Sequence, residues 1–286
     1  MDIKMLFPKD LKELTAALSQ MTGDSKILSG GTDLIIALHE GRMEPDLLID
    51  VSDIGEMLNT RLEYNAFKIG ASISFSSLQN DLMVRKYFPA LVQAAAGIGS
   101  KQIRNRGTIG GNIANASPAG DMLPPLIALG ARANILDNRG NINIRTIEEI
   151  LLQKNEAGLV YNEVIVSIDV PIPKPERHNC FAKLGTRKAV SIARLNIAMD
   201  VTYSNDDKVF NEPVVVMGAL GEAPVYARHS EEAINGRQIS ADTIYAFANA
   251  LSQDVCEAIP NRYSLPYKKE AVKGLANDIL RNFTNE

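Results

Sequence analysis

The order of apolar and polar positions predicts alternating strands and helices at the start of the chain. Apolar residues at helical spacing predict a helix over residues 9–21, and a short apolar run predicts a strand at Lys26–Leu28. A second helical pattern covers Asp33–Glu40, and the run LLIDV, which ends at Val51, reads as another strand. Strand, helix and strand in this order indicate a small α+β unit, which we place at residues 1–58.

From residue 59 the pattern indicates a second α+β unit, ending near residue 175. A strand at Ala66–Gly70, a hairpin and the apolar strand VIVSIDVPIP alternate there with an alanine-rich helix and an apolar helix that ends at Gly130. The segment Pro171–Asn179 contains three prolines and charged residues without periodicity, so we expect a linker.

Residues 176–286 are expected to form a third α+β domain. The strands expected there belong to one antiparallel sheet and cover Phe181–Leu184, Ala193–Tyr203 and Val214–Ala219. Helical patterns then cover Ser230–Ile234, Ala241–Cys256 and Tyr267–Phe283. The fold class expected for the whole chain is therefore α+β.

Composition excludes several classes of protein. The chain has 286 residues, 45% of them hydrophobic and 22% charged, with no apolar run near the roughly 18 residues that a membrane span requires. The N-terminal residues lack the pattern of a secretion signal, so a cytoplasmic location is expected. A net charge of −4 and the lack of a long basic block argue against nucleic acid as a partner.

Cysteine and histidine usage argues against a metal centre in this chain. Iron–sulfur clusters generally take about four thiolates, whereas the chain has two cysteines, Cys180 and Cys256. Its three histidines, His39, His178 and His229, are scattered. We expect neither a metal site nor an iron–sulfur cluster.

Two glycine-rich segments are the candidate binding elements. They are SGGTDLII (Ser29–Ile36) and TIGGNIANASPAGD (Thr108–Asp121), each placed between a strand-like or apolar run and a helix-like run. Adjacent glycines allow a ligand to approach the backbone, so that N–H groups can bind an anion such as a phosphate. Ordinary tight turns are the alternative for a single glycine pair. Two such pairs favour one long ligand held at both ends.

The motifs that carry a family resemblance are SGGTDLII, QIRNRGTIGGNIANASPAGDMLPPLIALGA and the late RYSLPYKKEAV. They resemble the medium, FAD-binding subunit of molybdenum-containing hydroxylases, the xanthine dehydrogenase and carbon monoxide dehydrogenase family. The resemblance covers essentially the whole chain. It implies two N-terminal subdomains of the PCMH-type FAD-binding fold and a C-terminal domain like that of the carbon monoxide dehydrogenase flavoprotein. It also implies that the two glycine loops hold the diphosphate of an extended FAD.

The resemblance implies cofactor contacts at matching positions. Short polar side chains in the loops would complete the hydrogen bonding, Asp121 matches an acidic contact, Ile165 an apolar one and Lys183 a basic one. From the sequence alone, Asp121 reads as the N-cap of a helix that starts at Met122. The full set of expected cofactor contacts is Ile27, Leu28, Ser29, Gly30, Gly31, Thr32, Asp33, Leu34, Thr108, Ile109, Gly110, Gly111, Asn112, Asn115, Asp121, Ile165 and Lys183.

The resemblance further implies noncovalent FAD, since neither loop offers the histidine or cysteine that attaches flavin in covalent branches. Molybdopterin would lie on a large partner subunit and iron–sulfur clusters on a small one. Electrons would pass from those clusters through the flavin to NAD or another acceptor, and no side chain of this chain would act as acid, base or nucleophile. Groups that select the organic substrate would belong to another chain, which leaves purines, nicotinate, aldehydes and carbon monoxide open.

Other readings compete with this one. NAD-using relatives carry acidic residues after the matched lysine, whereas this chain has Thr186, Arg187, Lys188, Ala189 and Val190, so we expect slow NAD reduction. A Rossmann dehydrogenase would need a G-x-G-x-x-G string, which the sequence lacks. A stand-alone flavin reductase of the same superfamily and a flavin-free assembly subunit remain the alternatives.

Overall fold

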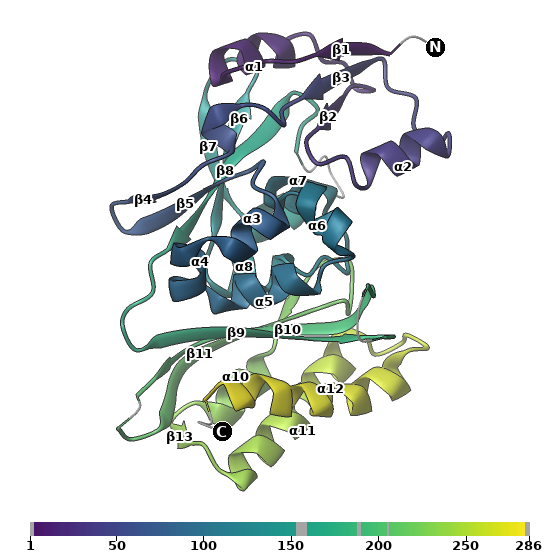
Figure 1. The fold of residues 1–286 in the computed structure, drawn as a ribbon. Helices are drawn as coiled ribbons and strands as arrows, with labels where there is room; N and C mark the ends of the chain where they lie inside the picture. The colour runs from purple at the N-terminus through teal and green to yellow at the C-terminus, as the bar shows by residue number, and fades with distance from the viewer. Residues whose placement is uncertain (1–2, 153–158, 188–189, 205, 284–286) are drawn as a thin grey trace. The chain divides into compact units, whose positions relative to one another are not determined.

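The computed structural model describes residues 3–152, 159–187, 190–204 and 206–283. It contains two compact units (Figure 1). The first unit comprises Met1–Leu78, Ser100–Ala116 and Gly130–Ile172, and the second comprises Gln79–Gly99, Ser117–Leu129 and Pro173–Glu286.

The first unit begins with a small parallel sheet in the order β1-β3-β2. Its elements are β1 (Lys4–Leu6), α1 (Leu11–Leu18), β2 (Lys26–Leu28), α2 (Leu34–His39) and β3 (Leu47–Asp50). Helix α1 starts after Asp10 because the Asp10 carboxylate accepts a hydrogen bond of 2.7 Å from the Glu13 N–H. Leu14, Leu18 and Ile49 are fully buried and form the core of this part.

An antiparallel sheet in the order β4-β5-β8-β6-β7 forms the rest of the first unit. Its strands are β4 (Thr60–Glu63), β5 (Ala66–Gly70), β6 (Arg132–Asp137), β7 (Ile142–Thr146) and β8 (Glu163–Pro171). Alongside them lie η1 (Gly55–Met57), α3 (Phe75–Asn80), α6 (Lys101–Arg106), α7 (Ile109–Asn115) and α9 (Ile147–Leu152). Ile69, Ile135 and Ile168 are fully buried, so this sheet carries a continuous apolar core.

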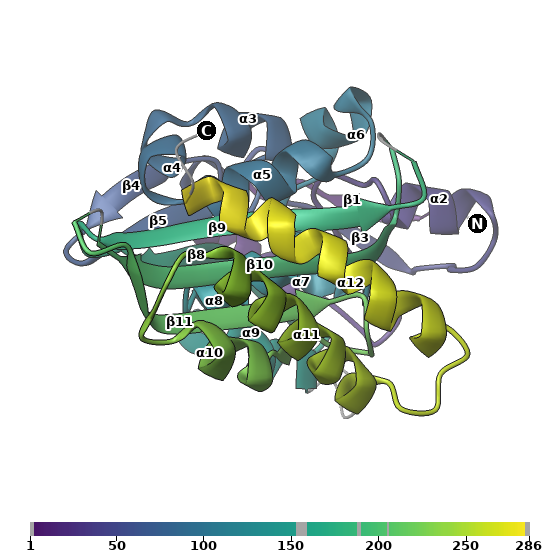
Figure 2. The same ribbon diagram turned by 90° about the horizontal axis from the view of Figure 1, so that it is seen from below.

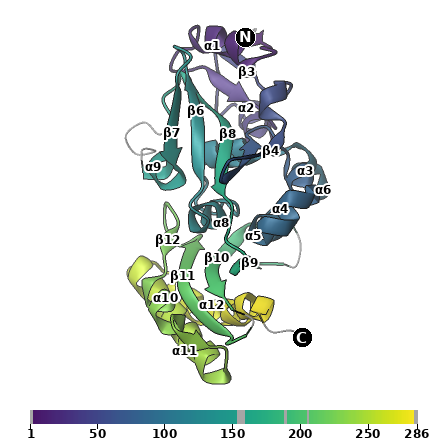
Figure 3. The ribbon, with the colours of Figure 1, turned by 90° about the vertical axis from the view of Figure 1, so that its left-hand side faces the viewer.

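The second unit is a sheet with helices on both faces (Figures 1 and 3). Its strands are β9 (Arg177–Gly185), β10 (Ala193–Tyr203), β11 (Val209–Gly218), β12 (Val225–Tyr226) and β13 (Arg237–Gln238). One face is covered by α5 (Pro89–Gly97) and α8 (Leu123–Ala128), with α4 (Leu82–Tyr87) beside α5. The other face carries α10 (Arg228–Ile234), α11 (Ala241–Ala258), α12 (Leu265–Leu280) and the short η3 (Arg281–Phe283), and Figure 2 shows α11 and α12 across it.

The core of the second unit follows the apolar spacing of its helices and strands. Phe247, Leu251 and Val255 lie on one face of α11, and all three are fully buried. At the far end of the sheet, the rings of Phe210 and Phe283 pack edge to face with centroids 5.3 Å apart. The α+β class expected from the sequence is confirmed, with an antiparallel sheet and helices in the C-terminal part.

Two features of the connection between the parts differ from expectation. Strand β8 continues to Pro171 and β9 starts at Arg177, so only the middle of the expected linker is outside a strand. Arg177 is drawn into the sheet because its Nε lies 2.7 Å from the Asp200 carboxylate on the adjacent strand. The α5 and α8 segments also join the second unit, because their apolar faces pack on β9, β10 and β11.

In the described part of the chain, no helix combines the length and the apolar character needed to cross a membrane.

Candidate functional site

The first glycine loop connects β2 to α2 and offers a row of backbone donors. Gly31 has φ of +72°, a left-handed conformation that favours glycine. Among the described residues, the N–H groups of Gly30, Gly31, Thr32 and Asp33 have no hydrogen-bond acceptor. We call these four groups the amide row. Consecutive N–H groups of this kind form an anion-binding concavity.

The second glycine segment is the first turn of helix α7, which corrects the expectation of an open loop. Thr108 caps this helix, and its Oγ1 accepts a hydrogen bond of 3.2 Å from the Gly111 N–H. The Gly110 N–H donates to the Ala71 carbonyl at 2.9 Å, and the Asn112 N–H donates to the Thr108 carbonyl at 3.0 Å. The backbone donors of this turn are therefore satisfied within the protein.

The two glycines of α7 differ in how much space a side chain would have. A Cβ on Gly110 would lie 2.6 Å from the Ala71 Cβ, so only glycine lets the helix approach the end of β5. A Cβ on Gly111 would meet only the Thr108 Oγ1, at 2.8 Å. Gly110 thus serves packing, whereas Gly111 is exposed.

The two glycine segments lie against each other. A Cβ on Gly30 would lie 2.0 Å from the Arg106 carbonyl oxygen and 3.0 Å from the Gly107 Cα, immediately before α7. Beside this contact, Ser29 Oγ donates to Ser72 Oγ at 3.2 Å. The expectation that two segments distant in sequence come together is therefore met within the first unit.

A cavity of about 830 Å³ opens where the two segments meet. Ile27 and Leu28 from β2 and Ile165 from β8 supply apolar wall, and Asn112 supplies a polar one. The Asn112 Oδ1 is buried without a hydrogen-bond partner among the described residues. An orphaned buried acceptor beside free donors is the arrangement of a polar ligand site.

Most of the expected cofactor contacts line this cavity, and three, Ile109, Asp121 and Lys183, do not. Ile109, the first residue of α7, is fully buried in the protein core. The expected residues that line the cavity are Ile27, Leu28, Ser29, Gly30, Gly31, Thr32, Asp33, Leu34, Thr108, Gly110, Gly111, Asn112, Asn115 and Ile165.

Asp121 and Lys183 belong to the second unit, where they form a buried ion pair. Lys183 Nζ lies 2.5 Å from Asp121 Oδ2 and also donates to the Gly97 carbonyl at 3.0 Å. Asn196 donates to the other Asp121 oxygen at 2.9 Å. Burial raises the pKa of the Asp121 carboxyl, while Lys183 and Asn196 act in the opposite direction.

This ion pair corrects the expected helix cap. Helix α8 starts at Leu123, and its N-cap position is Met122, which makes no side-chain cap bond. The Asp121 carboxylate is used by Lys183, a partner 62 positions away in sequence. Local sequence patterns carry no signal for such a partner.

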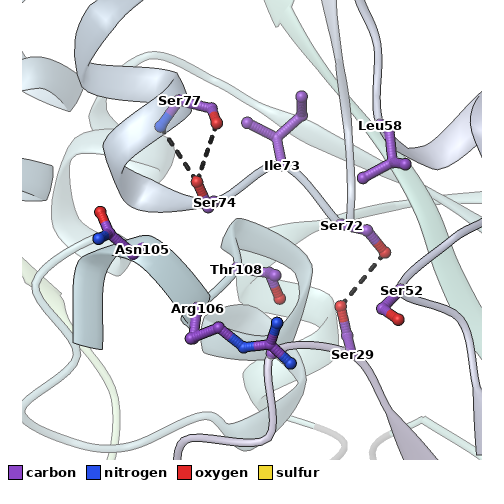
Figure 4. A pocket seen from close by; sticks show the side chains of 11 residues that line it. Ser29, Ser52, Leu58, Ser72, Ile73, Ser74, Ser77, Asn105, Arg106 and Thr108 are labelled. Atoms are coloured by element: carbon purple, nitrogen blue, oxygen red, sulfur yellow. Dashed lines mark hydrogen bonds between the residues drawn. The ribbon is translucent and has the colours of Figure 1, made fainter. Parts of the chain in front are cut away.

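Several cavity residues were not expected from the sequence. Ala71 and Ser72 come from the turn after β5, Phe75 is the first residue of α3, and Tyr161 precedes β8. A smaller pocket of about 210 Å³ lies on the same unit and includes Arg106, the last residue of α6 (Figure 4). The position of Arg106 shortly before the second glycine pair was the sequence feature that could have indicated this pocket.

No cluster of metal-ligating side chains occurs among the described residues.

The fold and the cavity define an α+β protein with a cavity whose lining includes the amide row and Asn112. A family model described as "FAD binding domain in molybdopterin dehydrogenase" matches residues 1–173, and one described as "CO dehydrogenase flavoprotein C-terminal domain" matches residues 181–283. The chain therefore belongs to the family of FAD-binding subunits of molybdenum-containing hydroxylases.

Individual relatives agree with this assignment. The chain is similar to the nicotinate dehydrogenase FAD-subunit of Eubacterium barkeri, with 30% identity over 96% of this chain and 93% of the relative. It is similar to the xanthine dehydrogenase FAD-binding subunit of Escherichia coli O157:H7, with 26% identity over 90% of this chain and 87% of the relative. A solved structure of carbon monoxide dehydrogenase from Hydrogenophaga pseudoflava superposes with a TM-score of 0.86 and 26% identity, covering 98% of this chain and 96% of that chain.

The buried ion pair generates a prediction about stability. Asp121→Asn or Lys183→Met alone leaves one buried group without its charged partner, since their side chains are 6% and 12% exposed, and each should lower unfolding free energy by about 2–4 kcal/mol. The double variant should lose less than the sum of the two. Denaturant unfolding of the four proteins measures the coupling.

The exposed pair Lys273–Glu270 on α12 is the matched control, and its single variants should leave the unfolding midpoint unchanged. Strictly additive losses at Asp121 and Lys183 would contradict the pairing described above.

Proposed function

We propose that the chain binds FAD noncovalently and serves as the electron-transfer subunit of a molybdopterin-dependent dehydrogenase. The observation that carries this proposal is the amide row, which has no acceptor within the described part of the chain and belongs to residues lining the same cavity as Asn112, whose buried Oδ1 has no partner there. A diphosphate supplies the oxygen acceptors that the amide row lacks, and a cofactor hydroxyl or amide group supplies a donor for Asn112.

The residues of the first unit would bind and orient the cofactor. The amide row would hold the diphosphate without a cationic side chain in either glycine segment, and Gly31 would admit the phosphates close to the backbone. Ile27, Leu28 and Ile165 would pack against apolar parts of the ligand and exclude water. We also propose Asp121 and Lys183 as cofactor contacts, in line with the matching family positions.

The chemistry itself would come from FAD, which accepts electrons singly and releases them in pairs. Relatives are named as FAD subunits and medium chains of dehydrogenases, such as the carbon monoxide dehydrogenase medium chain of Hydrogenophaga pseudoflava. By analogy, we propose a large molybdopterin-binding partner and a small iron–sulfur partner in the cytoplasm. The three-part division at residues 58 and 175 stays a proposal of the same kind.

Two alternatives are weaker. A stand-alone flavin reductase needs its own proton donor in the cavity. Two carboxylates line it: Glu163 is held by Arg145 at 2.7 and 2.9 Å, and Asp33 is exposed at the end of the first glycine loop. A flavin-free assembly subunit would have no use for a row of unsatisfied amides.

The proposal predicts that the purified chain is yellow and releases its flavin on acid precipitation. Gly30→Ala should weaken FAD binding by about tenfold or more, because the new Cβ would collide with the Arg106 carbonyl and separate the two glycine segments. Quenching of flavin fluorescence on binding measures the dissociation constant.

Gly55→Ala is the matched control, because a Cβ there meets nothing within 4 Å and FAD affinity should not change. Thermal unfolding of both variants checks that they fold. A wild-type chain without the flavin absorbance bands, given excess FAD, would overturn the proposed function.

The acceptor generates a separate prediction. Arg187 is exposed in the hairpin between β9 and β10, its Nε donating to the Val190 carbonyl at 2.8 Å, while Lys188 and Ala189 lie outside the described residues. The cationic loop replaces the acidic loop of NAD-using relatives, so we propose that NAD is a poor acceptor. In stopped-flow mixing, the dithionite-reduced complex should be reoxidised slowly by NAD and faster by a ferredoxin. Rapid reoxidation by NAD alone would refute this.

A further inference from the structure

The smaller pocket of the first unit, which we call the hydroxyl pocket, has an unusual set of polar groups. Its volume is about 210 Å³, and it shares Ser29, Gly30, Ser72 and Thr108 with the main cavity. No Asp or Glu is among its lining residues. The polar groups found only or mainly here belong to Ser52, Ser74, Ser77, Asn105 and Arg106 (Figure 4).

The hydrogen bonds already made in the pocket determine which donors are left. Ser29 donates to Ser72 at 3.2 Å, and Ser72 donates to the Val51 carbonyl at 3.1 Å, so both of these protons are used inside the protein. Thr108 Oγ1 accepts a hydrogen bond from the Gly111 N–H, which leaves the hydroxyl proton of Thr108 available.

The opposite wall leaves further donors. Ser74 and Ser77 share one hydrogen bond of 2.9 Å between their hydroxyls, so one of their two protons is available. Asn105 Oδ1 accepts from Ser76 at 2.6 Å, and this bond orients the amide so that its acceptor is satisfied and its NH₂ group is the remaining polar group. The donors left in the pocket are therefore the Thr108 hydroxyl, one hydroxyl of the Ser74–Ser77 pair and the Asn105 NH₂ group.

Arg106 adds a positive charge to these donors. Among the described residues, the arginines in ion pairs include Arg42, Arg145 and Arg177, whereas Arg106 has no carboxylate within ion-pair distance. Figure 4 shows its side chain extending past Thr108 toward Ser29. A planar guanidinium with five N–H donors matches the oxygens of a phosphate group.

We propose that the hydroxyl pocket is a binding site for a phosphate-type oxyanion, with Arg106 as its cation. The hydrogen bonds and lining residues of this pocket do not depend on FAD binding, so the site stands whether or not the proposed function does. Two sources of the anion share this chemistry. One is the diphosphate of FAD, an assignment that rests on the proposed function, and the other is a free phosphate or a second phosphorylated ligand.

The test uses the full-length chain freed of flavin and measures the binding of inorganic phosphate and pyrophosphate by titration calorimetry at fixed ionic strength. The wild-type chain should bind pyrophosphate, and Arg106→Gln should weaken that binding by about tenfold, the effect of losing a charge-assisted hydrogen bond. Arg106→Lys keeps the positive charge but loses the planar guanidinium with its paired N–H donors. Its pyrophosphate affinity should lie between those of the wild type and Arg106→Gln.

Lys101→Gln is the matched control, since it removes a positive charge from the same helix α6 without touching the pocket, and it should bind pyrophosphate as the wild type does. Thermal unfolding verifies that each variant folds. No pyrophosphate or phosphate binding by the wild type, or equal binding by Arg106→Gln, would overturn the proposal.

Repeating the titration on the FAD-loaded chain separates the two sources. Loss of pyrophosphate binding, with a raised FAD dissociation constant in Arg106→Gln, would identify the anion as the cofactor's diphosphate. Retained Arg106-dependent binding would identify a second phosphorylated ligand. Arg106-dependent phosphate binding by a chain that takes up no FAD would support this site and refute the proposed function.

Discussion

The close approach of Gly30 to the Arg106 carbonyl is the constraint on which the site depends. Only a residue without a Cβ fits there, because that atom would lie 2.0 Å from the carbonyl oxygen. The contact places the turn after β2 beside the start of α7, although the two are far apart in sequence. Both the main cavity and the hydroxyl pocket include Ser29 and Gly30 in their lining, so both are built around this contact.

The two glycine segments look alike in sequence but differ in what they offer a ligand. In α7 the first-turn N–H groups donate to Ala71 and Thr108, so this segment contributes packing, a hydroxyl and the Asn112 side chain. In the first loop the amide row has no protein acceptor among the described residues. The first loop therefore offers free backbone donors, and α7 offers a helical wall whose backbone donors are already used.

Much of the fold could be predicted from the sequence because its signals are local. Apolar spacing indicated α11, α12 and β10, and paired glycines after apolar runs indicated the two segments that line the main cavity. The features that could not be predicted depend on distant partners. Glycine has low helix propensity, so a helix over Ile109–Asn115 was not expected, yet its contact with Ala71 at the end of β5 overrides that preference.

The same reason explains the other differences. The sequence around Asp121 predicted a helix N-cap, but its carboxylate forms a buried ion pair with Lys183 on β9. Arg177 was predicted to lie in a linker, but it is part of β9, where its guanidinium forms an ion pair with Asp200 on the neighbouring strand. The hydroxyl pocket draws on segments around residues 29, 52, 72–77 and 105–108, and no short window of sequence contains that combination.

Amide hydrogen exchange with and without FAD tests the central claim most directly, because it reads the two glycine segments separately. The account predicts that the N–H groups of Gly30, Gly31, Thr32 and Asp33 exchange rapidly in the flavin-free chain and become protected when FAD is bound. The N–H groups of Gly110, Gly111 and Asn112 should be protected in both forms, since they already donate within the protein. Exchange at residues 30–33 that FAD leaves unchanged would contradict the account.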